Sequence, residues 1–419
     1  MDDREPNRRR FIKKGVALAG WVAAGGTGFA KGQTASSAAS ETPAKDLDAY
    51  GERSHYVTSA RIFPPPWGPD PFGLTSHLFT PLQDSVGIIT PASLHYTMAH
   101  KGFYVPDINP AQHRLMIHGM VDHPLIFTMD DLKRFPSVTR VHYLECNGNK
   151  ARPDHKTVQR ACGLTSCSAW TGVPLSLLLK EAGVHNGANW IVAEGVEDNK
   201  GSMTLPLAKA MDDMLVAYGQ NGEPVRPQNG FPLRLLVPGF EGLCNVKWLR
   251  RIKVVDEFYG TYNEMDRYTS VDPKTVKPLP FLQGPKSVIT FPSGSQKLPE
   301  RGHYQVTGLA WSGGGAIRRV EVSADGGHSW KDADLQSSVH RMAHTRFGID
   351  WVWSGEECVL MSRCTDELGQ LQPTLTEFAR FLHQTPIDLF TKAMVPNGHN
   401  NYILPWKIDP DGNVQNGLA

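Results

Sequence analysis

The chain has 419 residues, 40% of them hydrophobic, so it is long enough to bury a large core and to form more than one domain. Its 43 lysines and arginines nearly balance its 42 aspartates and glutamates, and the formal net charge is +1. This balance excludes the broad basic surface that nucleic-acid binding needs and a polybasic anchor for membrane surfaces.

The N-terminus carries a basic run, Arg-Arg-Arg-Phe-Ile-Lys, that begins at Arg8 and resembles a twin-arginine export signal. The apolar stretch after it, residues 15–30, is too short and too weakly hydrophobic to span a bilayer, so no membrane span is expected. We predict that residues 1–40 are signal and spacer, with cleavage after Ala30 or within residues 35–40. Because this route exports folded proteins that usually carry a cofactor, the signal predicts a periplasmic location and a cofactor together.

Residues 41–272 are predicted to form an α+β domain, because short strands and helices alternate there without βαβ regularity. The domain begins with an irregular segment rich in proline, glycine and aromatic residues. A strand, a Thr or Asp cap and a short helix are expected over residues 124–132, and a later helix is expected to end near Gly183. Further strands are expected at residues 113–121, 190–196, 231–237 and 245–254.

The segment 138–149 reads as an apolar strand that ends at Cys146 and is broken by an Asn-Gly turn. A thiol at that position lies at the end of a rigid element and faces a loop, which suits a reactive or metal-binding group. Alternatively, Cys146 is a small buried hydrophobic residue, as most free cysteines are. This segment alone favours the second interpretation.

Prolines crowd together at about residues 270–285, and beyond them the pattern is of strands only. At least five alternating strands within about 100 residues predict an all-β, immunoglobulin-like sandwich over residues 273–385. Asp325-Gly326-Gly327 is a hairpin signal inside it. Residues 386–419 are expected to be an irregular tail whose apolar end docks on the body of the protein.

Six cysteines need care, because the periplasm permits disulfides. Cys358 and Cys364 fall within one expected strand, where six extended residues span roughly 20 Å. That is far more than the Cα separation of about 5.5 Å that a disulfide needs, so these two are not expected to pair. A disulfide between Cys162 and Cys167 is left open. The sequence has no Cys-x-x-Cys-His haem attachment site.

Three features together resemble the sulfite oxidase family of molybdenum enzymes: the run Glu-Cys-Asn-Gly-Asn around Cys146, the run Val246-Lys247-Trp248-Leu249, and the sandwich. The resemblance covers about residues 85–385. Within that family the chain is most similar to the molybdenum-carrying chains of the Sox sulfur-oxidation system, which are sulfane or sulfite dehydrogenases. It implies an α+β molybdopterin-binding domain followed by an immunoglobulin-like dimerisation domain.

The resemblance also implies roles for individual residues. Cys146 matches the cysteine that ligates molybdenum, and a soft thiolate suits a metal that is also held by the dithiolene sulfurs of molybdopterin. The other residues implied at the active site are Tyr268, Arg346, Lys150 and Arg152. The residues implied to bind the pterin are Tyr96, Met98, His100, Glu197, Asn229, Arg234, Asn245, Val246 and Lys247.

The chain departs from sulfite oxidases at two arginines. Met98 stands where they have an arginine before Asn-His, and Ala151 stands at the second arginine of their Cys-Ala-Gly-Asn-Arg-Arg run, which Lys150 or Arg152 replaces only in part. Each charge-assisted bond to a free sulfite dianion is worth roughly 1.5–3 kcal/mol. The loss therefore favours sulfur carried on a larger substrate.

The activity implied is oxygen-atom transfer to carrier-bound sulfane sulfur or to sulfite, with molybdenum-molybdopterin as cofactor and no haem in this chain. Electrons then need a separate c-type cytochrome subunit, and the sandwich implies a homodimer of this chain within a hetero-oligomer. Alternatives are a free-sulfite dehydrogenase, a periplasmic sulfoxide-type reductase with the same cofactor, and a cofactor-less binding module that uses the sandwich.

Overall fold

The computed structural model describes most of the chain beyond residue 50. The described residues are 51, 53–63, 77–98, 105–196, 201–262, 264–265, 269–270, 277–278, 282–391 and 399–418. Residues 1–57 and 58–419 separate as two units, and the helices and strands of the described residues all lie in the second unit. The expected signal in residues 1–40, together with His100, Glu197 and Tyr268, lies outside the described residues. Within the described ranges, no helix is both long and apolar enough to cross a bilayer.

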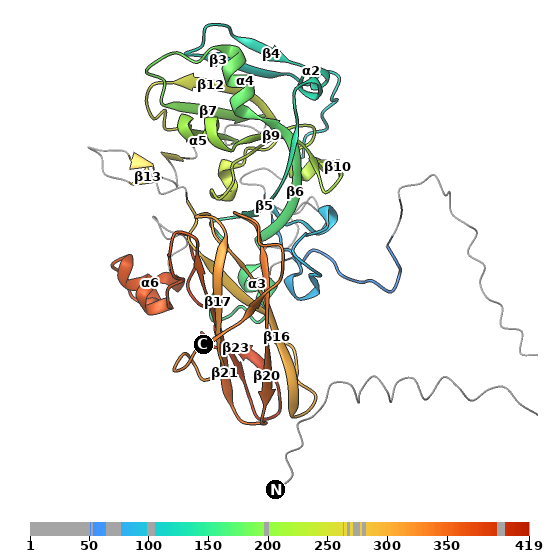
Figure 1. Ribbon diagram of the computed structural model, residues 1–419, viewed down its shortest axis with the longest axis vertical. Helices are drawn as coiled ribbons and strands as arrows, with labels where there is room; N and C mark the ends of the chain where they lie inside the picture. Colours follow the sequence, from blue (N-terminus) through green and yellow to red (C-terminus); the bar gives the residue numbers. More distant parts are fainter. Residues whose placement is uncertain are drawn as a thin grey trace, which may run out of the picture. The chain divides into compact units, whose positions relative to one another are not determined.

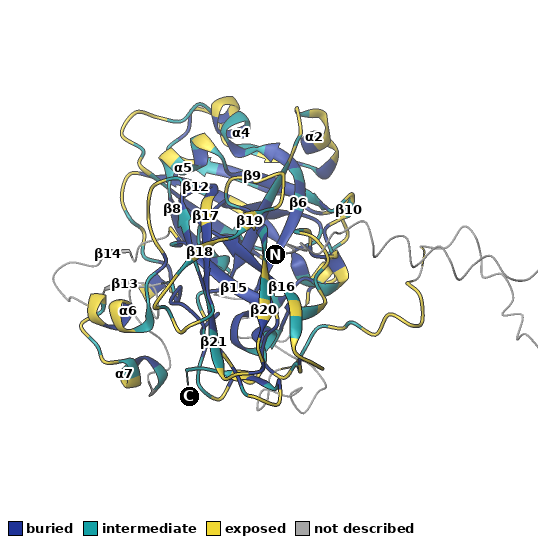
Figure 2. Cartoon of the chain, turned by 60° about the horizontal axis from the view of Figure 1, so that its bottom comes forward, coloured by how far each residue is buried: buried dark blue, intermediate teal, exposed yellow. Residues whose placement is uncertain are grey.

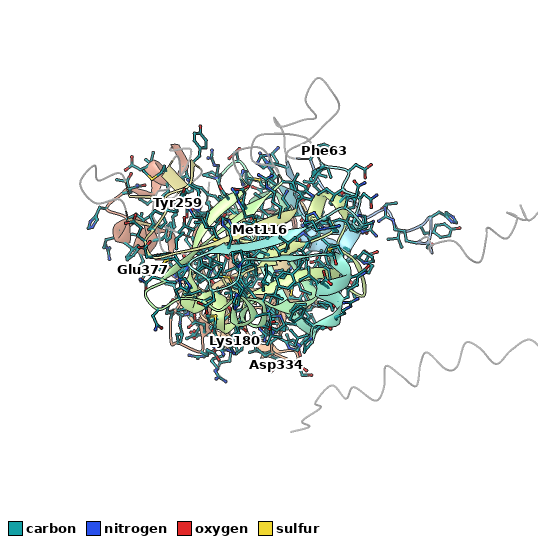
Figure 3. All side chains as sticks on the ribbon, turned by 90° about the horizontal axis from the view of Figure 1, so that it is seen from above. Phe63, Met116, Lys180, Tyr259, Asp334 and Glu377 are labelled. Atoms are coloured by element: carbon teal, nitrogen blue, oxygen red, sulfur yellow. The ribbon has the colours of Figure 1, made fainter. Side chains whose placement is uncertain are left out.

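A mixed five-stranded sheet with the order β4-β3-β12-β7-β8 forms one layer of the α+β domain (Figure 1). Strand β12 runs parallel to β3 and antiparallel to β7. The side chains of β3 alternate between buried and half-buried: Leu115 and Ile117 are fully buried, and Met116 between them is half-buried. Met116, labelled in Figure 3, is paired with Arg251 of β12. The strands are β3 (Leu115–Gly119), β4 (Leu125–Phe127), β7 (Trp190–Gly195), β8 (Ser202–Pro206) and β12 (Leu249–Val255).

A second, antiparallel sheet has the order β10-β9-β6-β5, with β11 also paired to β9. Strands β5 and β6 pair in continuous register from Val138 opposite Gly172 to Glu145 opposite Thr165. This confirms that the segment around Cys146 is a strand that stops just before the cysteine. The strands are β5 (Val138–Glu145), β6 (Thr165–Pro174), β9 (Leu215–Gln220), β10 (Glu223–Pro224) and β11 (Arg234–Leu236).

The expected strand over residues 245–254 forms only from Leu249 onward. Trp248, directly before it, has a φ of 51°, a left-handed conformation that an extended strand cannot contain. Residues before it therefore form a loop, and the backbone N–H of Leu235 in β11 donates to the carbonyl of Val246 in that loop. The loop is thus fixed against β11 instead of extending β12.

Short helices cover the sheets, and their ends follow the expected signals. Thr128 and Asp131 form a capping box at the start of α2, and Gly183 ends α4 with a φ of 71°. Figure 2 shows exposed outer faces on α2 and α4 around largely buried strands. The helices are α2 (Met129–Arg134), α3 (Val158–Cys162), α4 (Leu175–Ala182) and α5 (Leu207–Asp212), with 3-10 turns η1 (Leu82–Asp84), η2 (Ala92–Leu94), η3 (Pro227–Asn229) and η4 (Gly242–Cys244).

The later part of the chain is a two-sheet sandwich, as expected. One sheet has the order β15-β16-β20-β19 and the other β18-β17-β21-β22-β23, and buried residues from both share one core. The turn at Asp325-Gly326-Gly327 joins the antiparallel pair β17 and β18. The strands are β15 (Lys286–Phe291), β16 (Gly302–Trp311), β17 (Ile317–Ser323), β18 (Lys331–Asp332), β19 (Asp334–Leu335), β20 (Thr345–Trp353) and β21 (Cys358–Asp366).

The C-terminal tail is more regular than expected, because it supplies two strands to the sandwich. Strand β22 pairs with β21, and Trp406 within it is fully buried. Pairing at this position satisfies backbone groups of β21 that an open sheet edge would leave free. The remaining elements are α6 (Leu375–Phe381), α7 (Pro386–Thr391), β22 (Trp406–Ile408), β23 (Val414–Asn416), and the two-stranded pairs β1 (His77–Leu78) with β2 (Thr97–Met98) and β13 (Thr269–Ser270) with β14 (Lys277–Pro278).

All six cysteines are free thiols in the structure. Cys358 and Cys364 lie on the same strand, β21, as expected from the sequence. Cys162 ends helix α3 and Cys167 lies within β6, and the structure has no bond between them.

Candidate active site

Cys146 lies directly after β5 at the start of a tight loop, and only 3% of it is exposed. Its N–H donates to the carbonyl of Leu164 at 3.0 Å, and the N–H of Gly148 donates to its Sγ at 3.4 Å. Burial, with a smaller contribution from Glu241, holds the pKa of the Cys146 thiol well above its ordinary value. A thiolate at this position therefore needs a strong local positive charge, such as a bound metal ion.

A cavity with about 600 Å³ of empty space, part of it open to solvent, borders Cys146. All the residues that the sequence predicted to bind the cofactor and that the structure describes line this cavity. These are Tyr96, Met98, Cys146, Asn229, Arg234, Asn245, Val246 and Lys247. They come from segments before and after β5, so the fold assembles the cavity from three separate parts of the sequence.

Arg234 at the start of β11 is a cation in an otherwise apolar strand, and only 4% of it is exposed. Its Nη1 and Nη2 donate to the carbonyls of Asn229 and Asn245, both at 2.9 Å, and its Nε has no partner among the described residues. Its guanidinium carbon lies 4.9 Å from the ring centre of Trp170. No carboxylate of the described residues forms an ion pair with it, and burial lowers its pKa to about 10, so it remains charged at neutral pH.

Lys247 is the second cation of the cavity. Its Nζ donates to the carbonyl of Met98 at 3.0 Å and lies 4.3 Å from the ring centre of Trp248. The side chain of Asn245 accepts from the N–H of Val237 at 2.7 Å and donates to the carbonyl of Glu241 at 3.1 Å. Lys247 therefore carries charge at the cavity wall, whereas Asn245 mainly shapes the loop that holds it.

His95 and Tyr96 form another wall of the cavity. Burial lowers the pKa of His95 to about 3, so its ring is neutral, and its Nδ1 is 2.8 Å from the carbonyl of Tyr96 while its Nε2 has no described partner. The Tyr96 hydroxyl lies 2.8 Å from the point where a Cβ on Gly242 would be, closer than real Cβ atoms come. A residue larger than glycine at position 242 would therefore push into the cavity wall.

Three predicted active-site residues, Lys150, Arg152 and Arg346, do not line this cavity. Lys150 is 7% exposed, and burial together with Arg152 lowers its pKa to about 8. Arg346 on β20 is half-buried and donates to the carbonyl of Gly87 at 3.2 Å. Ala151 is 4% exposed and packs in the sandwich-side core. The roles of Lys150, Arg152 and Arg346 toward a substrate stay predictions.

The sequence reasoning missed two buried acids beside Cys146. Glu145 is fully buried, and its carboxylate accepts hydrogen bonds from four side chains. Glu241 accepts from the N–H groups of Asn147 at 3.1 Å and Leu243 at 2.9 Å, and burial raises its pKa to about 7. It also missed His95 and Gly242. A charge at the end of an apolar strand was the available signal for Glu145, and the glycines following β11 were the signal for Gly242.

The lining of the cavity fits a metal held by a bound organic group. Among the described residues, no cluster of three or more His, Cys, Asp or Glu side chains is placed to bind a metal ion. Cys146 alone would therefore need ligands from a bound molecule. Arg234, which no carboxylate of the described residues neutralises, suits an anionic group bound in the cavity. Nε2 of His95, which has no hydrogen-bond partner among the described residues, offers such a group a polar contact. A molybdenum–pterin cofactor with Cys146 as thiolate ligand meets these requirements.

Comparison with known proteins also indicates a molybdopterin cofactor. Residues 102–262 match the model of the oxidoreductase molybdopterin-binding domain, and residues 284–382 match that of the Mo-co oxidoreductase dimerisation domain. NADH nitrate reductase 1 of Arabidopsis thaliana is 34% identical over 64% of this chain and 33% of its own length. NADH nitrate reductase 2 of Phaseolus vulgaris is 35% identical over 68% of this chain and 36% of its own length. The chain thus spans about a third of these curated relatives.

Among solved structures, the sulfane dehydrogenase SoxCD from Paracoccus pantotrophus superposes with a TM-score of 0.80 at 35% identity. The match covers 89% of this chain and 94% of that chain. The domain order and the cavity beside Cys146 fit the matched family models, and the structural match covers most of the chain. The chain therefore belongs to the sulfite oxidase family of molybdopterin oxidoreductases.

Proposed function

We propose that this protein is the molybdenum subunit of a periplasmic dehydrogenase that oxidises sulfane sulfur on a carrier, or sulfite, and passes the electrons to a c-type cytochrome. The observation that carries this proposal is the similarity to a sulfane dehydrogenase over 89% of the chain at 35% identity. The nitrate reductases are equally similar in identity, but this chain spans only about a third of them.

In the proposed site, Cys146 would hold the metal as a thiolate, and Arg234 with Lys247 would hold the anionic part of the pterin. When bound, the cofactor would supply two-electron redox chemistry and an oxygen atom for transfer to sulfur. The buried Arg234 would orient that anionic part, because its guanidinium is fixed by two backbone carbonyls and a tryptophan ring. The neutral His95 contributes a polar partner without adding charge.

The side chains near the cavity support a substrate larger than free sulfite. Met98 lines the cavity where sulfite oxidases have an arginine, and Ala151 is packed into a hydrophobic core rather than presented to the cavity. With these two arginines absent, a small dianion has fewer charge-assisted partners. A sulfur atom on a protein carrier gains contacts outside the cavity and depends less on them.

The remaining parts of the proposal rest on the sequence. The run beginning at Arg8 supports export by the twin-arginine route, and the absence of a Cys-x-x-Cys-His run supports a separate cytochrome subunit as electron acceptor. The match of residues 284–382 to a dimerisation domain supports a homodimer.

The experiment is a substrate comparison on purified holoprotein. Metal content is measured first, and kcat/KM is then compared for a persulfidated cysteine peptide, sulfite and thiosulfate, with a soluble c-type cytochrome as acceptor. Methionine sulfoxide and nitrate, which would be reduced, are assayed with a reduced electron donor. We expect the persulfidated peptide to be turned over best. Faster reduction of nitrate or sulfoxide than oxidation of any sulfur donor would contradict the proposal.

Two cysteine variants complete this test. Cys146→Ser should lose its activity and most of its molybdenum, whereas Cys358→Ser, which changes a half-buried thiol on β21, should keep both. Full activity and metal content in Cys146→Ser would contradict the assignment of the ligand.

A further inference from the structure

The side chain of Glu145, next to Cys146 in the chain, is held by four donors. Its Oε1 accepts from Nζ of Lys286 at 2.7 Å and from Nδ2 of Asn149 at 2.7 Å. Its Oε2 accepts from Nε1 of Trp311 at 2.6 Å and from Nε2 of His399 at 2.6 Å. Asn149 belongs to the loop at residues 146–152, here called the cysteine loop. Lys286 and Trp311 lie on strands β15 and β16 of the sandwich, and His399 lies in the C-terminal segment, residues 399–418. One carboxylate therefore joins three parts of the chain.

The Glu145 carboxylate is completely buried, and its Oε1 lies 2.7 Å from Nζ of Lys286. Lys286 is itself only 2% exposed and also donates to the carbonyl of Asn149 at 2.9 Å. Glu145 and Lys286 therefore form a fully buried ion pair in which most hydrogen-bond acceptors and donors have partners.

The C-terminal segment makes further bonds to backbone carbonyls of the cysteine loop. Nδ2 of Asn400 donates to the carbonyl of Asn147 at 3.0 Å, and the hydroxyl of Tyr402 donates to that of Ala151. Nδ2 of Asn416 donates to the carbonyl of Arg152 at 2.8 Å. These bonds fix the path of the loop rather than any of its side chains.

We propose that Glu145 is a positioning residue for Cys146, and that the sandwich and the C-terminal segment hold the metal-binding loop through it. Glu145 does not line the cavity, so its action on a bound cofactor is indirect. Lys286 and Trp311 fix the carboxylate from the sandwich side, and His399 fixes it from the C-terminal side. This inference rests on the proposed role of Cys146 as ligand, but its main test needs no cofactor.

The test measures how readily Cys146 becomes accessible in full-length protein purified from cells that cannot make the pterin. Iodoacetamide labelling is followed by mass spectrometry at Cys146 and, as an internal reference, at Cys167, which is fully buried in β6. In Glu145→Gln we expect labelling of Cys146 to accelerate about tenfold while Cys167 is unchanged, because only the loop opens. In holoprotein, the same variant should release molybdenum to a chelator faster than wild type.

Two further variants guard against general misfolding. His399→Gln keeps the Glu145–Lys286 pair and should give a smaller, still selective acceleration at Cys146. Glu321→Gln is the matched control, because Glu321 is a buried carboxylate paired with Arg363 at 2.9 Å within the sandwich. It should leave Cys146 labelling unchanged. Parallel acceleration of Cys146 and Cys167 in Glu145→Gln, or no selective change in His399→Gln, would overturn the proposal.

Discussion

Two buried charges lie close to Cys146, and their surroundings differ in kind. Glu145 has one cationic partner, Lys286, and three further hydrogen-bond donors, all at 2.6–2.7 Å. Arg234, which shares the cavity with Cys146, has only backbone carbonyls and an aromatic ring, and no carboxylate of the described residues pairs with it. Glu145 is neutralised within the fold, whereas Arg234 is not.

This difference distinguishes a residue that stabilises the site, Glu145, from a residue that would bind a ligand in it, Arg234. A buried charge without a partner of opposite sign is unfavourable unless a ligand supplies that partner. The surroundings of Arg234 therefore indicate a binding place for an anionic ligand. The surroundings of Glu145 indicate a structural role, in which Glu145 and its four donors connect the loop after Cys146 to the sandwich and the C-terminal segment; we call this group the Glu145 joint. Disturbing the Glu145 pair should therefore mainly reduce stability, whereas replacing Arg234 should mainly weaken ligand binding.

The largest expected effect comes from breaking the joint. Lys286→Met leaves the Glu145 carboxylate buried with fewer partners, so we expect unfolding to become easier by about 3–5 kcal/mol. Chemical denaturation of cofactor-free protein measures this loss. Lys407→Met, which breaks an exposed pair with Glu357 at 2.9 Å, is the control and should change stability by less than about 1 kcal/mol. Equal losses in both variants would show that the Glu145 pair has no special importance.

A pH experiment probes the same region. His344 contacts the ring of Trp311 at 5.0 Å between centres, and burial lowers its pKa to about 4 although Glu145 acts to raise it. Between pH 6.5 and 4 the unfolded chain binds a proton at this histidine and the folded chain does not, so stability falls as the pH falls. The total is roughly 3 kcal/mol.

The matched variant for this experiment is His344→Gln. Its melting temperature should decline less steeply than that of wild type between pH 6.5 and 4. Identical slopes in the two proteins would mean that His344 does not contribute to the pH dependence.

Changing the other charge should affect binding more than folding. Arg234→Met removes a charge-assisted partner of the ligand, worth roughly 1.5–3 kcal/mol, so cofactor affinity should fall about ten- to hundredfold. The stability of the cofactor-free protein should change little or increase, because a buried unpaired charge is removed. Molybdenum content and denaturation curves, measured on the same preparations, check both halves. A marked loss of stability with full molybdenum content would reverse our interpretation of this charge.

The smallest effect is expected at the surface. Glu194 pairs with both Arg250 and Arg251 on the neighbouring strand, and both arginines are largely exposed. Glu194→Gln should reduce stability by less than about 1 kcal/mol, and salt should reduce this difference further. Denaturation at low and high salt tests this, and a loss as large as that of Lys286→Met would remove the distinction between surface and buried pairs.

The cavity residues were predicted through the family resemblance, and local sequence signals supported only two of them. Cys146 follows an apolar strand and precedes an Asn-Gly turn, and Arg234 is a cation inside a hydrophobic run. The joint was not predictable, because Lys286 and His399 lie 141 and 254 residues from Glu145 in the chain. The tail strands were missed for a related reason. A three-residue strand such as β22 forms only because the edge of β21 is there to pair with it.

The central claim is that Cys146 ligates a molybdenum cofactor in the cavity. X-ray absorption at the molybdenum edge tests it most directly, because it counts the sulfur neighbours of the metal. A Cys146→Ser protein that retains some metal should show one sulfur neighbour fewer than wild type. An unchanged number of sulfur neighbours, with the metal still bound, would contradict the assignment of Cys146 as ligand.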